Sequence, residues 1–387
     1  MQRRTFIQAA GSAVATLGVP AWAPQALAAS EGPLSARHIT IGSTLALTGM
    51  LGGAGRDYVL GTNAAFAAVN KAGGIHGREL RLLAMDDAYV PKRTLENATK
   101  MIGGNEIFAL LSVFGTANSY AILPMTEKEG VPFVAPVTGA SSLRRKEQRF
   151  TFFVRPSYTD ETVHALTLMS DMGIRDVAVV YLDNAFGKEV LKDAERTFER
   201  LKLRSVGAFP LAVTGANGDE VAQKVIDAKA GGVFIATTGA ATTSFVLPMH
   251  TRMPALPIAG VSVAVISSEI PKLGDAIKGV AVARVFPRAE QEKFAAVRTF
   301  QAQMKAAGAD DGVGGSAFEA WINSQVMIEG LRRAGRDLTR EKLRAGLASI
   351  KRLELGDLNL GFADSAPYVA SERVEMTVFG DKGRVIS

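Results

Sequence analysis

The sequence predicts an α/β protein with two lobes of like design, each built on a mainly parallel β-sheet. The chain has 387 residues, more than a single hydrophobic core usually holds. Short apolar runs lie between glycine and proline residues, and small and polar residues follow each run, as in the buried strands of parallel sheets. The alternation of strand and helix restarts near residue 160, which indicates a second sheet.

Three of these apolar runs lie close together and are followed by the segments GTANS, VTGASS and PSYTDE. In an open α/β sheet, ligand-facing groups lie outside the carboxyl ends of the strands. The first two segments offer hydroxyl and backbone N–H donors, and the third adds Tyr158 with the carboxylates of Asp160 and Glu161. We therefore expect one small ligand between anion-binding donors and an acidic group. The runs are Phe108–Val113, Val131–Pro136 and Phe150–Val154.

The first half begins with a strand and a glycine-rich loop, Thr48–Gly55, which opens a helix. The loop lacks both the GxGxxG spacing and the Gly-Lys-Ser/Thr of a P-loop, so we expect it to admit a ligand or the opposite lobe rather than a nucleotide. Asp86 and Asp87 end the next strand without a neighbouring histidine, which favours helix capping or loop fixation over catalysis or metal binding. The predicted elements are strand 38–47, helix 55–71, strand 80–85, helix 91–102 and helix 118–129.

The second half repeats the strand–helix alternation, and right-handed crossovers would build a second parallel sheet. The chain is expected to cross between the halves near Arg155–Tyr158 and Val285–Arg288, which makes a hinge. The predicted strands are 177–181, 205–210, 233–237, 256–260 and 279–286; the helices are 161–172, 188–200, 219–230, 238–251, 289–307, 316–334 and 339–349; a hairpin of 373–379 with 384–386 closes the chain.

The N-terminus has the features of an export signal. A positive segment with Arg3 and Arg4 precedes an apolar, small-residue stretch over Ile7–Val19 and the A-x-A site Ala26-Leu27-Ala28. The sequence Arg3-Arg4-Thr5-Phe6-Ile7 resembles a twin-arginine signal. We expect residues 1–28 to be a signal peptide, with cleavage near Ala28-Ala29. No later stretch reaches the roughly 18 apolar residues of a membrane span, so we expect no membrane insertion.

Composition narrows the function further. The formal net charge is +6, and loss of Arg3 and Arg4 would lower it to +4. The basic clusters 144–146 and 332–333 are short and not interleaved with aromatic residues, so we expect surface charge and no nucleic-acid binding. The chain has no cysteine, which excludes disulfides, thiolate metal sites, cysteine nucleophiles and the cysteine of a lipid anchor. We expect a free periplasmic protein.

No catalytic constellation is present in the sequence. The four histidines, at positions 38, 76, 164 and 250, are scattered. Neither H-E-x-x-H nor G-x-S-x-G occurs, and the predicted cleft residues supply no nucleophile, base and oxyanion donor together. We therefore expect no enzymatic activity, no cofactor and no metal.

The segment Asn70-Lys-Ala-Gly-Gly-Ile-His-Gly-Arg-Glu-Leu resembles the leucine/isoleucine/valine-binding proteins, the type I periplasmic binding proteins of ABC importers. Its N-x-x-G-G-I-x-G-R pattern is fairly specific to that family, and the likeness runs over essentially the whole mature chain. The supporting segments are Thr48-Gly49, Asp86-Asp87, Pro91, Glu129-Gly-Val-Pro and Asp183–Gly187.

The resemblance implies the periplasmic binding protein type I fold, in which a three-strand hinge joins two Rossmann-like lobes that close on a ligand. Residues 37–156 plus 287–355 would form lobe I, and residues 157–286 plus 356–387 would form lobe II. The third crossing would fall near Gly356–Phe362.

The resemblance also implies site residues. In amino-acid-binding members, hydroxyl and N–H groups of the first lobe hold the ligand carboxylate, and an aspartate of the second lobe faces the ammonium group. These positions correspond to Thr116, to the turn Thr138-Gly139-Ala140 and to Asp160. Thr116 and Ala117 precede a helix predicted to begin near residue 118, whose free N–H groups and dipole favour an anion.

Three departures from the family pattern argue for a different ligand. Ser262 stands where those members have a second acidic partner for the ammonium group, and Ala54 stands where they have an aromatic residue. Their tyrosine at the sheet end falls in the segment with Thr238 and Gly239. The resemblance therefore implies a wider pocket for a small anionic or polar organic ligand, with a branched-chain amino acid as an alternative. Tyr158 and Phe186 either stack on an aromatic acid or pack at the lobe rims.

The predicted function is a monomeric solute receptor that delivers a small molecule to an inner-membrane ABC permease. Ligand binding would stabilise the closed state, which the permease recognises. The alternatives are a sensor subunit that reports occupancy to a regulator and, with less support, a periplasmic enzyme. The sequence does not separate the receptor from the sensor, because both use the same closure.

Overall fold

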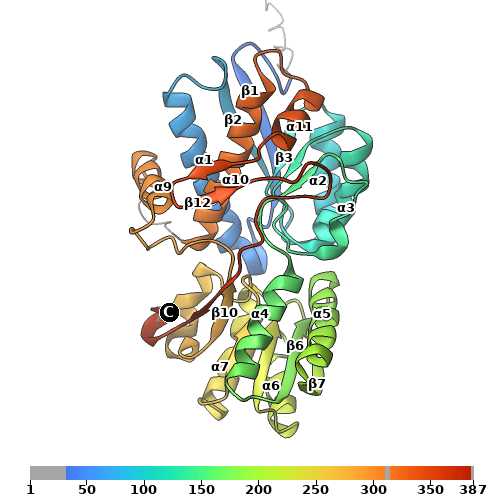
Figure 1. Ribbon diagram of the computed structural model, residues 1–387, viewed down its shortest axis with the longest axis vertical. Helices are drawn as coiled ribbons and strands as arrows, with labels where there is room; N and C mark the ends of the chain where they lie inside the picture. The colour runs from blue at the N-terminus through green and yellow to red at the C-terminus, as the bar shows by residue number, and fades with distance from the viewer. Residues whose placement is uncertain (1–31, 310–313, 385–387) are drawn as a thin grey trace, which may run out of the picture. The chain divides into compact units, whose positions relative to one another are not determined.

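The computed structural model describes residues 32–309 and 314–384, which form two six-stranded sheets and a two-stranded hairpin (Figure 1). All pairings within the sheets are parallel except that of β14 with β10, so the predicted α/β class with two mainly parallel sheets is confirmed. The predicted signal peptide lies outside the described residues. The strands are β1 (His38–Leu45), β2 (Glu79–Asp86), β3 (Ala109–Leu111), β4 (Phe133–Val134), β5 (Thr151–Phe153), β6 (Asp176–Leu182), β7 (Arg204–Leu211), β8 (Gly232–Ala236), β9 (Ile258–Gly260), β10 (Ala281–Arg284), β11 (Leu353–Leu355), β12 (Leu358–Leu360), β13 (Tyr368–Val369) and β14 (Glu375–Val378).

The sheet of the first lobe has the order β13-β5-β4-β3-β1-β2, and that of the second has the order β14-β10-β9-β8-β6-β7. In each sheet the second strand lies at one edge with the first strand next to it. The later strands follow in sequence order on the other side of the first strand, as in doubly wound folds, except that a strand from the end of the chain closes the far edge. The helices are α1 (Gly52–Lys71), α2 (Pro91–Gly103), α3 (Thr116–Lys128), α4 (Tyr158–Asp171), α5 (Ala185–Leu201), α6 (Gly218–Asp227), α7 (Gly239–Arg252), α8 (Ile270–Leu273), α9 (Ala295–Ala306), α10 (Gly315–Ala334) and α11 (Arg340–Ala348).

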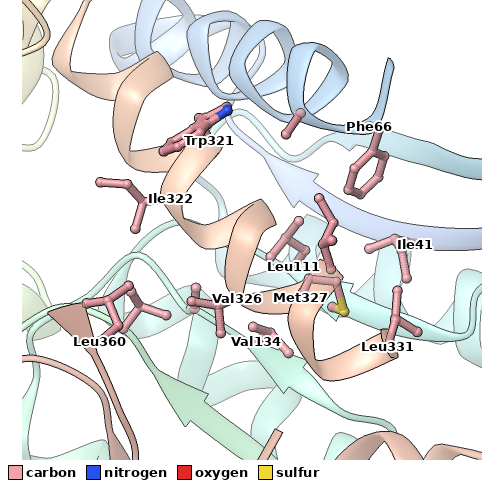
Figure 2. Packing of buried hydrophobic residues seen from close by; sticks show 14 of the residues in the cluster. Ile41, Phe66, Leu111, Val134, Trp321, Ile322, Val326, Met327, Leu331 and Leu360 are labelled. Carbon is pink, nitrogen blue, oxygen red and sulfur yellow. The ribbon is translucent and has the colours of Figure 1, made fainter. Parts of the chain in front are cut away.

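The first sheet is buried on both faces because its strands alternate between two cores. In β3, Ala109 and Leu111 pack with α1 and α10, whereas Leu110 packs on the opposite face with α2 and α3. Val134 and Phe133 of β4 divide in the same way. Figure 2 shows the α1/α10 side, where residues of α10 and the sheet interdigitate. Apolar residues on both faces are therefore what the central strands β3 and β4 require.

Helices α1 and α10 lie side by side at unusually close range. A Cβ atom on Gly61 would stand 2.0 Å from the carbonyl oxygen of Ala317, so the two backbones touch where Gly61 has no side chain. Trp321, one turn further along α10, is buried, and its Nε1–H donates to Gln303 Oε1 at 2.6 Å. This contact fixes α10, which also lines the cavity described below.

The paired aspartates hold the loops between strands and helices, as the sequence favours. Asp86 accepts bonds from the N–H groups of Leu47 and Thr48 and from the Thr48 hydroxyl, which anchors the glycine-rich loop. Asp87, fully buried, accepts bonds from the hydroxyls of Thr44 and Thr94. Both carboxylates therefore accept hydrogen bonds from loop and helix residues of the protein itself.

The chain crosses between the lobes after β5, after β10 and after β13. The predicted third crossing near Gly356–Phe362 is wrong, because this segment and β13 belong to the first lobe. The ring of Tyr368 stacks on Phe152 with centroids 4.6 Å apart, and Phe362 packs on the same ring at 5.3 Å. The crossing therefore lies between Val369 and Glu375, and the lobe boundary predicted at residue 356 moves with it.

The first strand of the predicted terminal hairpin is present as β14. β14 pairs antiparallel with β10, and a 3₁₀ helix at Asp381–Gly383 follows it. The predicted return strand falls largely outside the described residues. The helix predicted from residue 289 begins at Ala295, because residues 285–290 instead follow β10 along the cavity.

Substitution of the two helical glycines tests the α1/α10 contact. Gly61→Ala should lower the free energy of unfolding by about 2 kcal/mol, because overpacking of a close contact costs about 1–3 kcal/mol. The control is Gly103→Ala in α2, where nothing lies within 4 Å of the added Cβ. The control should be neutral or stabilise by about 0.5 kcal/mol. Urea denaturation measures both, and equal effects would refute the close contact.

Candidate functional site

A cavity of about 200 Å³ is lined by residues of both lobes. Its walls are residues that follow the carboxyl ends of β3, β8 and β9, together with residues of α1, α10 and the first two crossings. This is the edge at which parallel sheets present ligand-facing groups. The cavity is therefore the candidate site.

Five of the eleven predicted site residues line the cavity: Thr116, Tyr158, Phe186, Thr238 and Ser262. Ala54 also lines it. Thr116 is the first residue of α3, two positions earlier than predicted, and its hydroxyl lies 2.8 Å from that of Thr138. Thr138 thus supports a lining residue from behind.

Four further predicted residues do not line the cavity: Ala117, Gly139, Ala140 and Gly239. The two glycines instead allow close contact between the lobes. The carbonyl of Gly139 accepts from the N–H of Tyr158 at 2.7 Å. Gly239 has a φ of +58°, and a Cβ there would stand 2.8 Å from the Met50 carbonyl oxygen. The turns that contain Gly139 and Gly239 therefore contact the opposite lobe, whereas the sequence predicts that they contact the ligand.

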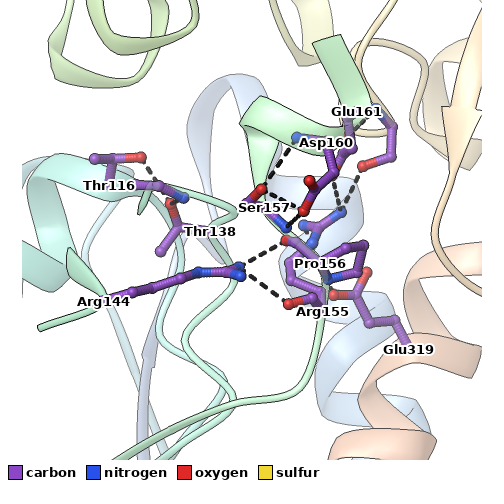
Figure 3. Close-up of polar contacts among 11 residues, drawn as sticks. Thr116, Thr138, Arg144, Arg155, Pro156, Ser157, Asp160, Glu161 and Glu319 are labelled. Atoms are coloured by element: carbon purple, nitrogen blue, oxygen red, sulfur yellow. Dashed lines mark hydrogen bonds and ion pairs between the residues drawn. The ribbon is translucent and has the colours of Figure 1, made fainter. Parts of the chain in front are cut away.

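Asp160, predicted to face an ammonium group, lies outside the cavity lining and caps α4 instead (Figure 3). Ser157 Oγ accepts from the Asp160 N–H at 3.0 Å, and the Asp160 carboxylate accepts from the Ser157 N–H at 3.4 Å and from the Ser157 hydroxyl at 2.5 Å. This reciprocal pairing is a capping box, which satisfies N–H groups at the start of the helix. The carboxylate of Asp160, which the family resemblance assigned to the ligand, is thus bonded within the first turn of α4.

The central polar group of the cavity is Arg155, which the sequence prediction missed as a site residue. Its guanidinium lies 3.9 Å from Glu161 of α4 and 3.7 Å from Glu319 of α10, so one carboxylate comes from each lobe (Figure 3). The side chains of Arg155 and Glu161 are 3% and 0% exposed. An arginine within the apolar segment TFFVRPS and a glutamate on the apolar face of α10 were the signals available in the sequence.

Ser262 organises this cluster. Its hydroxyl accepts from Arg155 Nη2 at 2.5 Å, and its N–H donates to Glu161 Oε2 at 2.6 Å. Ser262 thus holds the guanidinium and a buried carboxylate in place. Arg144, predicted to be part of a surface cluster, instead donates to the carbonyls of Arg155 and Pro156 and fixes the first crossing.

The surroundings shift the protonation equilibria of the cluster. Burial raises the pKa of Glu161, which opposes its ionisation, although Arg155 acts in the other direction. Burial acts to lower the pKa of Arg155, but Glu319, Tyr158 and Glu161 outweigh it and hold that pKa above its ordinary range. Burial, followed by the charge of Glu319, raises the pKa of Tyr58, so this phenol stays protonated and able to donate. The guanidinium is therefore charged at every working pH.

Two aromatic pairs flank the polar cluster, one from each lobe. Tyr58 and Phe114 meet edge to face with ring centroids 4.6 Å apart, and Tyr158 and Phe186 meet at 5.0 Å with tilted planes. All four residues line the cavity. Such walls suit an apolar or planar ligand body.

Direct bonds join the lobes both outside the cavity lining, between Ser142 and Glu189, and within it, between Ser267 and Gly315. Glu189 of α5 accepts from the N–H of Ser142 at 3.0 Å and from its hydroxyl at 2.5 Å. The hydroxyl of Ser267 accepts from the N–H of Gly315 at 3.0 Å. Contact between the lobes therefore does not depend on the cavity residues alone.

Other site classes find no support in the described part of the chain. No group of three His, Asp or Glu side chains in residues 32–309 and 314–384 is placed to hold a metal ion. Within the same residues, no helix is long and apolar enough to cross a membrane.

Comparison with known proteins agrees with this architecture. The sequence profile of a family described as "Periplasmic binding protein" matches residues 38–366, which is most of the chain. The chain belongs to the periplasmic binding protein family. Membership implies a periplasmic location, and the predicted family resemblance is confirmed.

Individual relatives show how far the likeness extends. The chain is 31% identical over 167 residues to Leu/Ile/Val-binding protein homolog 3 of Brucella melitensis, which covers 42% of this chain and 45% of the relative. The chain thus matches less than half the length of that relative.

Solved structures cover more of the chain. A substrate-binding periplasmic protein from Ralstonia solanacearum has a TM-score of 0.84 at 28% identity and covers 90% of this chain and 99% of its own. An ABC transporter solute-binding protein from R. palustris, in complex with benzoate, has a TM-score of 0.80 at 17% identity. The match covers 90% of this chain and 95% of the R. palustris chain. The second match shows the fold alone.

Removal of the Asp160 carboxylate tests its capping role. Asp160→Ala should lower the free energy of unfolding by about 1 kcal/mol, because the start of α4 loses its reciprocal cap. Asp171→Ala at the other end of the same helix is the matched control, and it should cause no loss because an acid is unfavourable at a helix C-terminus. Urea denaturation measures both variants. If Asp160→Ala is as stable as the unsubstituted protein, the capping box does not stabilise α4.

Proposed function

We propose that the protein is the solute-binding receptor of an ABC importer, which encloses a small polar or anionic organic ligand between its lobes and delivers it to an inner-membrane permease. The observation that carries this proposal is the cavity that both lobes line, with a buried guanidinium at its centre and aromatic rings on either side. Ligand pockets of proteins commonly combine apolar walls with a few placed polar groups.

The family supports the class of protein, and the relatives support a range of ligands. The Brucella relative is named for leucine, isoleucine and valine binding, and the R. palustris structure holds benzoate. The ligand class therefore extends from branched-chain and other amino acids to amides and aromatic acids.

The mechanism follows from the way the cavity is divided. Thr116, Tyr58 and Glu319 belong to the first lobe, whereas Tyr158, Phe186 and Ser262 belong to the second. A ligand that touches both sets interacts fully only when the lobes are together, so it shifts the population toward the closed form. The three crossings are the segments able to absorb the rotation.

A thermal-unfolding screen of amino acids, amides, aromatic acids and dicarboxylates tests the proposal. A true ligand at about 100 times its dissociation constant should add about 2.7 kcal/mol of stability. Chromatography after prolonged incubation should return that ligand unchanged.

Two outcomes would count against the receptor. Chemical conversion of the stabilising compound would mean that the protein is an enzyme. Failure of every compound class to stabilise the chain would mean that the cavity does not bind small organic solutes.

A further inference from the structure

We propose that the ligand is a compact aromatic monocarboxylate, with its carboxylate on Arg155 and Tyr58 and its ring between the aromatic pairs of the two lobes. This inference rests on the proposed receptor function and narrows its ligand class. Four observations carry it: open donors, the charge of the lining, the room available and the lack of a free ammonium partner.

The first observation is a set of buried donors with no hydrogen-bond acceptor. Nε and Nη1 of Arg155 have no partner within hydrogen-bond geometry, and the hydroxyl of Tyr58 has none within strict geometry although Glu319 lies close enough to raise its pKa. Both side chains line the cavity and are only 3% exposed. The carboxylates of Glu161 and Glu319 lie 3.9 and 3.7 Å from the guanidinium of Arg155, beyond hydrogen-bond distance. Buried polar groups in native proteins are nearly always bonded, so these donors await an acceptor.

The second observation is the charge of the cavity lining. Among the described lining residues, three arginines, Arg155, Arg284 and Arg288, face two glutamates, Glu290 and Glu319. The lining thus carries one positive charge in excess; Glu161, which contacts Arg155 from outside the lining, offsets this charge only when it is ionised, and its burial opposes ionisation. Burial and the charge of Arg288 lower the pKa of Arg284 to about 10, as expected for a guanidinium short of counter-ions. A ligand with one negative charge complements this lining.

The third observation is the size and nature of the remaining space. An engineered apolar cavity of about 150 Å³ accommodates benzene. The present cavity, at about 200 Å³, has room for one ring with a small substituent. The rings of Tyr58 and Phe114 on one side and of Tyr158 and Phe186 on the other supply edge and face contacts to a planar body.

The fourth observation concerns amino acids, which need an acidic partner for the ammonium group. Asp160 is held in the cap of α4, and Ser262 has no charge. The two lining glutamates are already paired, Glu319 with Arg155 and Glu290 with Arg288 at 3.6 Å. An ammonium group on the ligand would therefore compete with a guanidinium for each lining carboxylate, and a ligand without an ammonium group fits better.

Ligand chemistry provides the first test, without any substitution. Isothermal titration calorimetry of the unmodified protein should show benzoate binding at least tenfold more tightly than benzamide, because a charged carboxylate accepts stronger bonds from a guanidinium than a neutral amide does. Benzoate should also bind at least tenfold more tightly than leucine.

Two variants then test which residues bind the ligand carboxylate. Tyr58→Phe keeps the ring and should weaken benzoate about five- to tenfold through loss of one donor. Arg155→Met should weaken it at least 100-fold. The control is Arg340→Met, which removes an arginine that bonds the carbonyls of Ile107 and Phe108 outside the cavity. The control should retain benzoate affinity even where its melting temperature falls. Tyr58→Phe decides the matter if Arg155→Met does not fold.

The outcomes separate the two proposals. Equal affinity for benzoate and benzamide, or unchanged benzoate affinity in Tyr58→Phe, would overturn the assignment of the carboxylate. Tight binding of leucine with none of benzoate would overturn the aromatic ligand class and leave the receptor intact. Absence of binding across every compound class would overturn both.

Discussion

The structure depends on the burial of one guanidinium between two lobes. Removing an ion from water costs several kcal/mol, so Arg155 requires compensating charge on every side from which water is excluded. Glu161 comes from the second lobe and Glu319 from the first, and the arginine itself lies in a crossing between them. Any movement that separates the lobes changes this balance. The charge cluster therefore couples lobe position to whatever enters the cavity.

Close approach of the lobes is the second constraint, and small residues make it possible. Gly139 and Gly239 bring main chain of one lobe against the other, where any side chain would collide with Tyr158 or Met50. The glycine-rich loop plays the same part, because a Cβ on Gly53 would stand 2.6 Å from the Cβ of Ser268. Glycines that suggest a phosphate-binding loop in the sequence serve contact between lobes in this fold.

Much of the fold could be predicted because burial on both faces forces long apolar strands, and Gly and Pro mark their ends. Thr116, Tyr158, Phe186, Thr238 and Ser262 were found for the same reason, since residues after parallel strands face a common edge. The third crossing was misplaced because the hairpin β11–β12 and the stacking of Tyr368 on Phe152 are contacts between distant segments.

The charged residues were harder to predict. Asp160 lies in the pattern S-x-x-D, which suits a helix cap as well as the ligand contact that the family resemblance implies, and only the three-dimensional structure separates the two roles. Arg155 and Glu319 are 164 positions apart, so their pairing has no local pattern to reveal it. Tertiary charge pairing is the part of this site that sequence periodicity does not encode.

The most direct test is a crystal structure of the protein soaked or co-crystallised with benzoate. We expect the benzoate carboxylate oxygens at about 3 Å from Nε or Nη1 of Arg155, with the benzoate ring between the Tyr58/Phe114 and Tyr158/Phe186 pairs. A carboxylate bound to Thr116 at the start of α3, with the Arg155 donors still without an acceptor, would contradict it.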